Sequence, residues 1–126
     1  MKTSESLKKL IEQRSAHKKG FAQKIKATRG QLAVNKMVRC GLADTLKNMK
    51  ADLKQADRDG EFELASAIRC MINATRTQLH ALLAYKKMSE KMLAFIVNQI
   101  DELATEIKAL DAAWEQAKAD EVAAKA

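Results

Sequence analysis

Few side chains in this sequence are of a type that performs catalysis, and their spacing does not bring them together. The two histidines, His17 and His80, and the two cysteines, Cys40 and Cys70, are candidates for a nucleophile, a general base or a metal ligand. Metal sites and catalytic dyads have recognisable ligand or partner spacings, and these four residues follow none of them. Two cysteines in a helical chain of this size are typical of reduced thiols rather than of a disulfide framework.

Carboxylates offer no better site. Glu102 and Glu106 lie four residues apart and therefore share one face of a helix. A di-metal site in a helical bundle would also need Glu-x-x-His motifs, which the sequence lacks, and no glycine-rich phosphate loop occurs. The sequence therefore predicts a protein that is not an enzyme and that has no catalytic residues, metal ligands or cofactor.

Basic side chains are the remaining candidates, because they can neutralise phosphate groups. The chain of 126 residues has a formal net charge of +7. Residues 1–58 hold 15 basic and 5 acidic groups, whereas residues 59–126 hold 8 and 11. The basic N-terminal segment is expected either to pair with the acidic C-terminal helix or to contact nucleic acid through its phosphates, and the sequence leaves both open. The candidate nucleic-acid contacts are Lys8, Lys9, Lys18, Lys19, Lys24, Lys26 and Arg29.

The elements that must position these groups are helices. Proline is absent, only four glycines occur, and good helix formers dominate the composition. No run alternates apolar and polar residues over the length of a strand. The predicted fold class is all-α, an antiparallel hairpin or bundle of long helices with coiled-coil-like packing, containing either three or four helices or two long ones.

An apolar seam near the C-terminus is the most regular pattern in the sequence. Its residues recur at alternating intervals of three and four, which keeps one stripe of a helix facing a partner helix. Such a seam predicts packing and not chemistry. The predicted packing interface consists of Leu93, Ile96, Ile100, Leu103, Ile107, Leu110 and Trp114.

We expect a single helical domain over residues 1–126 that reverses direction at residues 57–60, where Asp and Gly end one helical pattern. The expected elements are a basic N-terminal helix over about 4–29, a helix over about 31–57, a helix over about 61–87 and an acidic heptad helix over about 89–120. The sequence does not decide whether Gly30 and the segment 85–89 interrupt the helices.

Two apolar series predict the side chains that pair across the turn. The first comprises Leu32, Val38, Leu42, Leu46, Met49 and Leu53, and the second comprises Phe62, Ala65, Ile68, Ile72, Leu79, Leu82 and Leu83. Phe21, Phe95 and Trp114 also lie on apolar stripes and are expected in the core, which leaves Tyr85 as the aromatic residue expected at the surface.

The sequence around the predicted turn carries a recognisable set of residues. They are Leu53, Ala56, Gly60, Glu61, Phe62, Glu63, Ala65, Arg69 and Ile72. This set, within residues 53–72, resembles the UVR helical hairpin of nucleotide excision repair subunits and certain bacterial stress regulators, and it departs from that pattern at Asp57, Ser66 and Cys70. In those families the hairpin is a docking module. The resemblance therefore implies protein docking, with Phe62 and Arg69 near the contact, and no catalysis.

No membrane-spanning segment is expected, because the longest strictly apolar run, residues 92–97, is far shorter than the ~20 residues that a bilayer requires. We expect a cytoplasmic protein, or one in the host cytoplasm if it is viral. The predicted function is that of a non-enzymatic helical protein-interaction or oligomerisation protein, whose partner is another protein or a second copy, with no small-molecule substrate. The alternatives are a nonspecific nucleic-acid-binding protein, which would bind DNA or RNA through the basic N-terminal half, and a small structural or host-modulating protein of a virus or mobile element.

Overall fold

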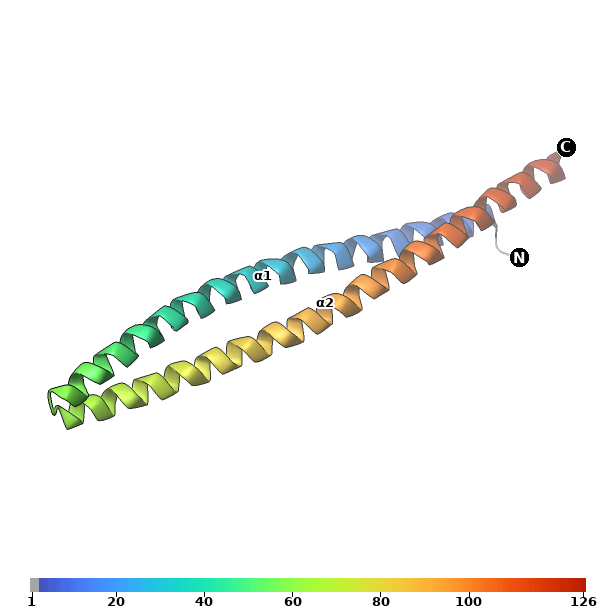
Figure 1. Cartoon of the computed structure of the whole chain (residues 1–126). Helices are drawn as coiled ribbons and strands as arrows, with labels where there is room; N and C mark the ends of the chain where they lie inside the picture. Colours follow the sequence, from blue (N-terminus) through green and yellow to red (C-terminus); the bar gives the residue numbers. More distant parts are fainter. Residues whose placement is uncertain (1–2) are drawn as a thin grey trace. The chain divides into compact units, whose positions relative to one another are not determined.

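Two long helices make up nearly all of the structure, a computed structural model that describes residues 3–126. Helix α1 spans Ser4–Arg58 and helix α2 spans Phe62–Lys125 (Figure 1). The helices pack against each other as an antiparallel hairpin, and the described residues contain no strand. The predicted all-α hairpin is therefore confirmed, in its version with two long helices.

The structure shows neither of the two helix interruptions that the sequence left open. The segments 4–29 and 31–57 belong to one continuous helix, and so do the segments 61–87 and 89–120. Gly30 stays helical at a position where nothing lies within 4 Å of an added Cβ, and Ser89 is buried inside α2 instead of capping a new helix. A helical glycine costs about 1 kcal/mol relative to alanine, which the packing of neighbouring turns against the other helix can offset.

The contacts between the helices fall into two compact units. Unit 1 joins the chain up to Thr28 with Met92–Ala126, and unit 2 is Arg29–Lys91, which contains the turn. The sequence predicted one helical domain without this division.

The turn is a Schellman motif followed directly by α2. Gly60 has a φ of 71°, in the left-handed region that glycine adopts without strain. The Glu61 N–H donates to the Ala56 carbonyl at 3.0 Å and the Gly60 N–H donates to the Asp57 carbonyl at 3.3 Å, which satisfies the last carbonyls of α1. The Ala65 N–H then donates to the Glu61 carbonyl at 2.9 Å and begins the first turn of α2.

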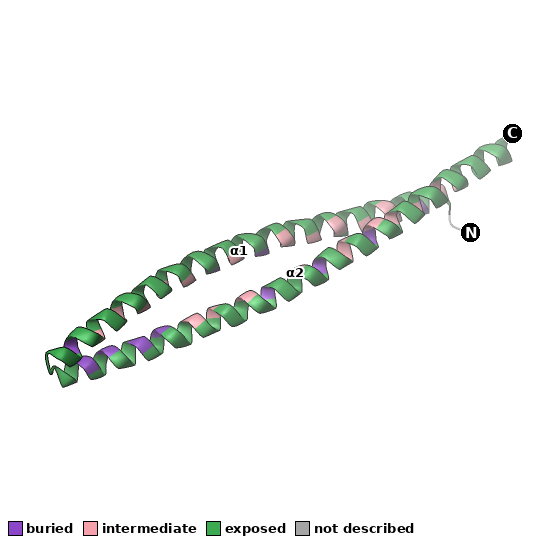
Figure 2. Cartoon of the chain, in the orientation of Figure 1, coloured by how far each residue is buried: buried purple, intermediate pink, exposed green. Residues whose placement is uncertain are grey.

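In unit 2 the buried and half-buried residues recur at alternating intervals of three and four along both helices (Figure 2). These are the a and d positions of a heptad, whose side chains pack between two helices. On α1 they are Leu32, Asn35, Arg39, Leu42, Leu46, Met49, Leu53 and Ala56. On α2 they are Ala65, Ile68, Ile72, Thr75, Leu79, Leu82, Lys86 and Ser89.

The best-buried cluster of unit 2 lies beside the turn, where Ala56 and Ala65 meet Ile68 and Ile72. Small side chains at the first two positions leave room for the helices to approach each other. Three residues expected in this core are exposed instead: Val38, Phe62 and Leu83. Val38 and Leu83 stand one position beside the seam, and Phe62 is the first residue of α2.

Unit 1 uses the same spacing. All seven residues of the predicted C-terminal seam are buried or half-buried, with Ile96 and Leu103 the most deeply buried. Opposite them, α1 contributes Leu7, Ile11, Phe21 and Ile25, together with the half-buried Arg14 and Lys18. Phe95, expected in the core, is exposed because it lies outside this seam.

Candidate interaction surfaces

The two long edges of unit 2 differ in chemistry. In the heptad, the g position directly precedes a and the e position directly follows d. Because the helices are antiparallel, the g positions of one helix border the g positions of the other, and the e positions border the e positions. Gln31 and Tyr85, both at g, illustrate this arrangement, since the Tyr85 hydroxyl donates to Gln31 Oε1 at 3.1 Å. A hollow on the g side is lined by Val38 and Gln78, whereas a hollow on the e side is lined by Leu83 and its neighbours.

Over residues 31–48 of α1 and 64–88 of α2, one edge of unit 2 carries no charged side chain, and Asp52, at the next g position of α1, is the first charge on that edge. Within these ranges the edge consists of the c and g positions, which on α1 are Gln31, Val34, Val38, Gly41, Thr45 and Asn48. On α2 they are Leu64, Ala67, Met71, Ala74, Gln78, Ala81, Tyr85 and Met88. We call these residues the charge-free face. Large apolar side chains stand open on it: Val34 is 59% exposed, Met71 52% and Met88 70%.

The opposite edge of unit 2 is basic. At its b and e positions, α1 places Arg29, Lys36, Lys47, Lys50 and Lys54, and α2 places Arg69, Arg76 and Lys87. The acidic residues at the same positions are Asp57 and Glu90, and each lies in an ion pair with a residue of α2. We call the basic residues of this edge the basic face.

Polar residues interrupt the seam of unit 2 beside these faces. Asn35 is only 5% exposed. Its amide donates to the Leu82 carbonyl at 3.0 Å, and its Oδ1 accepts a hydrogen bond from Arg39 Nε at 2.7 Å. A buried asparagine at a core position of a coiled coil is the type of residue that fixes the register of the helices.

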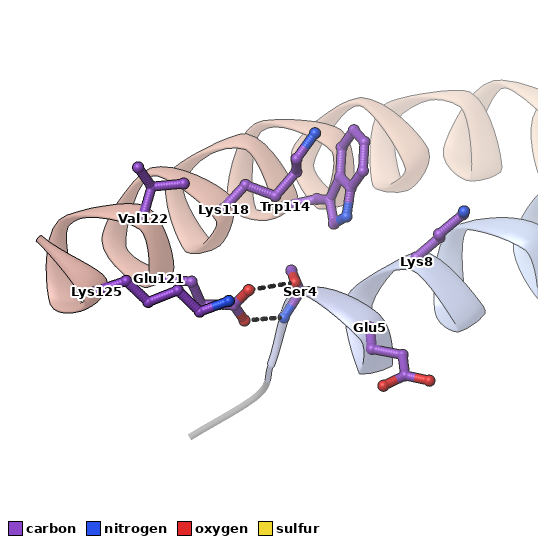
Figure 3. Close-up of a pocket in the computed structure, with 8 residues that line it drawn as sticks. All are labelled: Ser4, Glu5, Lys8, Trp114, Lys118, Glu121, Val122 and Lys125. Carbon is purple, nitrogen blue, oxygen red and sulfur yellow. Dashed lines mark hydrogen bonds between the residues drawn. The ribbon is translucent and has the colours of Figure 1, made fainter.

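The start of α1 contacts the last turns of α2 in unit 1. The Glu121 carboxylate accepts hydrogen bonds from the Ser4 backbone N–H at 3.0 Å and from the Ser4 hydroxyl at 2.8 Å (Figure 3). These two bonds lower the pKa of Glu121 below its ordinary value of 4.5, and the bond from the Ser4 backbone N–H has the larger effect. Thr3 caps the same helix end, because its hydroxyl accepts the Ser6 N–H at 3.3 Å. Trp114 lies beside this contact, with Lys118 Nζ 4.4 Å from its ring centre.

The predicted nucleic-acid contacts do not share one face. Lys8, Lys9 and Lys19 are exposed, whereas Lys18 lies half-buried at a seam position and Lys24 stands on the g side of α1. Lys26 and Arg29 are exposed on the b and e side, the first in unit 1 and the second in unit 2.

Internal pairing neutralises little of the basic N-terminal segment. Its one ion pair within the described residues joins Arg14 to Glu106, with Nε 3.0 Å from Oε1. The N–H does not point along this line, so the contact is an ion pair without a hydrogen bond.

The two residues implied by the UVR resemblance behave differently from each other. Phe62 is 80% exposed at the start of α2. Arg69 turns toward the end of α1, where its Nη2 donates to both carboxylate oxygens of Asp57 at 3.0 and 3.2 Å. Since Asp57 is one of the departures from the motif, this ion pair is a feature of the present chain.

Residues suited to catalysis stay apart. Within residues 3–126, no group of three or more His, Cys, Asp or Glu side chains could hold a metal ion. His17 packs against Phe21, with ring centres 6.4 Å apart, and Cys40 and Cys70 are free and exposed. No helix over the same residues is long and apolar enough to cross a membrane.

Comparison with protein-family models, with curated proteins and with solved structures gave no match. The UVR resemblance therefore stays a prediction.

Proposed function

We propose that this chain is a non-enzymatic interaction protein that associates with a second copy of itself through the charge-free face of unit 2. The observation that carries the proposal is the run of c and g positions without a charge, on which apolar side chains are open to solvent. Contiguous exposed apolar patches are uncommon on monomers and mark interaction sites.

A second copy suits this face because a two-fold contact places the same surface on both sides of the interface. Two copies that each carry a net charge of +7 repel one another wherever their basic side chains meet. The charge-free face is the edge of unit 2 on which two copies can meet without that repulsion. Its c and g residues also follow the three-and-four spacing that packs helices together, so two hairpins would form a four-helix arrangement.

The thin core of the hairpin supports the same proposal. In the described residues no large side chain is fully buried, and each helix touches its partner along one stripe only. Most helical stability in proteins comes from the packing of an apolar face, so covering a second stripe would strengthen both helices.

The proposal is tested by placing carboxylates on the charge-free face. We expect the double variant V38E/A81E to reduce the mass measured by light scattering from a dimer to a monomer, because each copy would bury unpaired charges in the contact. Both positions are exposed in the hairpin itself, so the variant is expected to remain helical by circular dichroism.

The matched control is A43E/L83E, which adds the same two carboxylates to the e side. Leu83 and Val38 have similar exposed fractions, 40% and 45%. This control is expected to keep the dimer mass. Equal masses for both variants, or a natural chain that is a monomer at every protein concentration measured, would contradict the proposal.

A further inference from the structure

We propose that the basic face of unit 2 binds the phosphate backbone of double-stranded nucleic acid. The face lies on the opposite edge from the charge-free face, so this binding site does not depend on self-association. It shares Arg29 with the N-terminal set that the sequence predicts, but its other members lie within residues 36–87, outside that set.

The basic side chains of this face converge. Lys47, Lys50 and Lys54 line one hollow, and Arg76 lines a second together with the seam residue Arg39. The two hollows adjoin, since Ala43 and Leu46 belong to both. The face thus forms one continuous strip across α1 and α2.

The charges of the strip are not neutralised within the protein. The described ion pairs of unit 2 join Arg69 to Asp57 and Lys86 to Glu90, so none involves Lys47, Lys50, Lys54 or Arg76. The positive potential of these four side chains is therefore available to an external anion.

The spacing of the charges fits a polyanion. From Lys36 to Lys54 the strip extends about 27 Å along α1, at 1.5 Å for each residue of a helix. A ligand that engages the whole strip must carry negative charges at intervals over that distance, as the phosphates of nucleic acid do.

Duplex fits better than single strands or a lipid surface. The face contains no Phe, Trp or Tyr, so it lacks the stacking platform that proteins use for unpaired bases. Ala43, Asn73 and Ser66 stand between the basic residues. Leu83 is the one large apolar side chain at the b and e positions of unit 2, so this face offers little apolar area for insertion into a bilayer. Contacts to phosphates alone give binding without sequence preference.

The experiment compares two triple variants of the full chain in binding to a random-sequence DNA duplex, followed by fluorescence anisotropy at several salt concentrations. K47Q/K50Q/K54Q neutralises the proposed face. K8Q/K9Q/K19Q removes the same number of charges from exposed positions of the N-terminal segment. Glutamine keeps the helix propensity of lysine, so both variants are expected to fold.

We expect the natural chain to lose affinity steeply as salt rises. In K47Q/K50Q/K54Q the slope of log K against log salt should be shallower by about 2 to 3, and the affinity at about 0.1 M salt should fall roughly 100-fold. The N-terminal variant should change much less.

Three results would overturn the inference: no duplex binding by the natural chain at low salt, equal losses in the two triple variants, or tighter binding to a single strand or an anionic phospholipid vesicle than to duplex. The V38E/A81E variant separates the two proposals, because its duplex affinity per chain should persist even when its dimer is lost.

Discussion

At the scale of single residues, a few hydrogen bonds fix the turn in unit 2 and the start of α1 in unit 1. Gly60 closes the turn because its left-handed φ lets Glu61 and Gly60 donate to the last carbonyls of α1. In unit 1, Glu121 of α2 satisfies the first backbone N–H of α1 and places a negative charge at the positive end of that helix.

The substitution Gly60→Ala should lower the free energy of unfolding by about 1 to 2 kcal/mol, because an alanine with positive φ is strained. No atom lies within 4 Å of the added Cβ, so the loss arises from the backbone alone. Gly30→Ala is the matched control and should instead raise stability by about 1 kcal/mol, since Gly30 is helical and also open. Urea unfolding measures both changes, and a stabilising Gly60→Ala would refute this account of the turn.

The contact between Ser4 and Glu121 should depend on pH. The pKa of Glu121 is lower in the folded chain than the ordinary 4.5, so the contact stabilises the fold above pH 4.5 and is lost as the pH falls through the lowered pKa. An NMR titration of the Glu121 carboxyl should report this lowered pKa. Ser4→Ala should move it only part of the way back, because the backbone bond, which is the larger cause, remains. An unshifted Glu121 would contradict the contact.

At the scale of the helices, spacing predicted the structure better than turn signals did. The seam from Leu93 to Trp114 was visible because its apolar residues recur without a break, and the turn at Gly60 was visible because Asp and Gly lie together. The continuity of the helices at Gly30 and Ser89 was not visible. Polar residues such as Asn35 and Lys86 occupy seam positions there. Because they interrupt the apolar repeat, apolar spacing alone does not reveal the continuous heptad.

The charge-free face was missed for a related reason. Val38 of this face lies one position beside the seam, so apolar spacing places it in the core together with true seam residues, as it does Leu83 on the e side. The two stripes can be told apart only after the register of both helices is known. The heptad positions then distinguish an apolar edge from a basic edge. The net charge of the chain does not reveal this difference.

Ile72 and Met37 test the division between seam and surface. Ile72→Ala should destabilise the fold by about 2 to 3 kcal/mol, because Ile72 is 5% exposed and packs in the cluster beside the turn. Met37→Ala should change stability by less than about 0.5 kcal/mol, because Met37 is 75% exposed and alanine favours a helix. Similar thermal shifts for the two variants would contradict the assigned register.

At the scale of the whole molecule, the two proposals concern opposite edges of one hairpin unit. A dimer formed through the charge-free face would turn a basic face outward on each copy. The assembly should therefore hold two duplexes at once, and native gels should show a species with two labelled duplexes for the natural chain. V38E/A81E should give only complexes that contain one chain and one duplex. A species with two duplexes in that variant would show that binding of two duplexes does not require self-association, which would contradict this expectation.

Methionine oxidation is a direct test of self-association through the charge-free face, because exposed methionines lie both on that face and away from it. Met37, Met71 and Met88 are all exposed in the hairpin, with Met37 and Met88 nearly equal at 75% and 70%. Met71 and Met88 belong to the charge-free face, whereas Met37 lies at the outward f position of α1. In dilute peroxide, followed by peptide mass spectrometry, we expect Met37 to be oxidised rapidly while Met71 and Met88 are protected, and we expect V38E/A81E to remove that protection. Oxidation of Met88 as fast as that of Met37 in the natural chain would contradict self-association through this face.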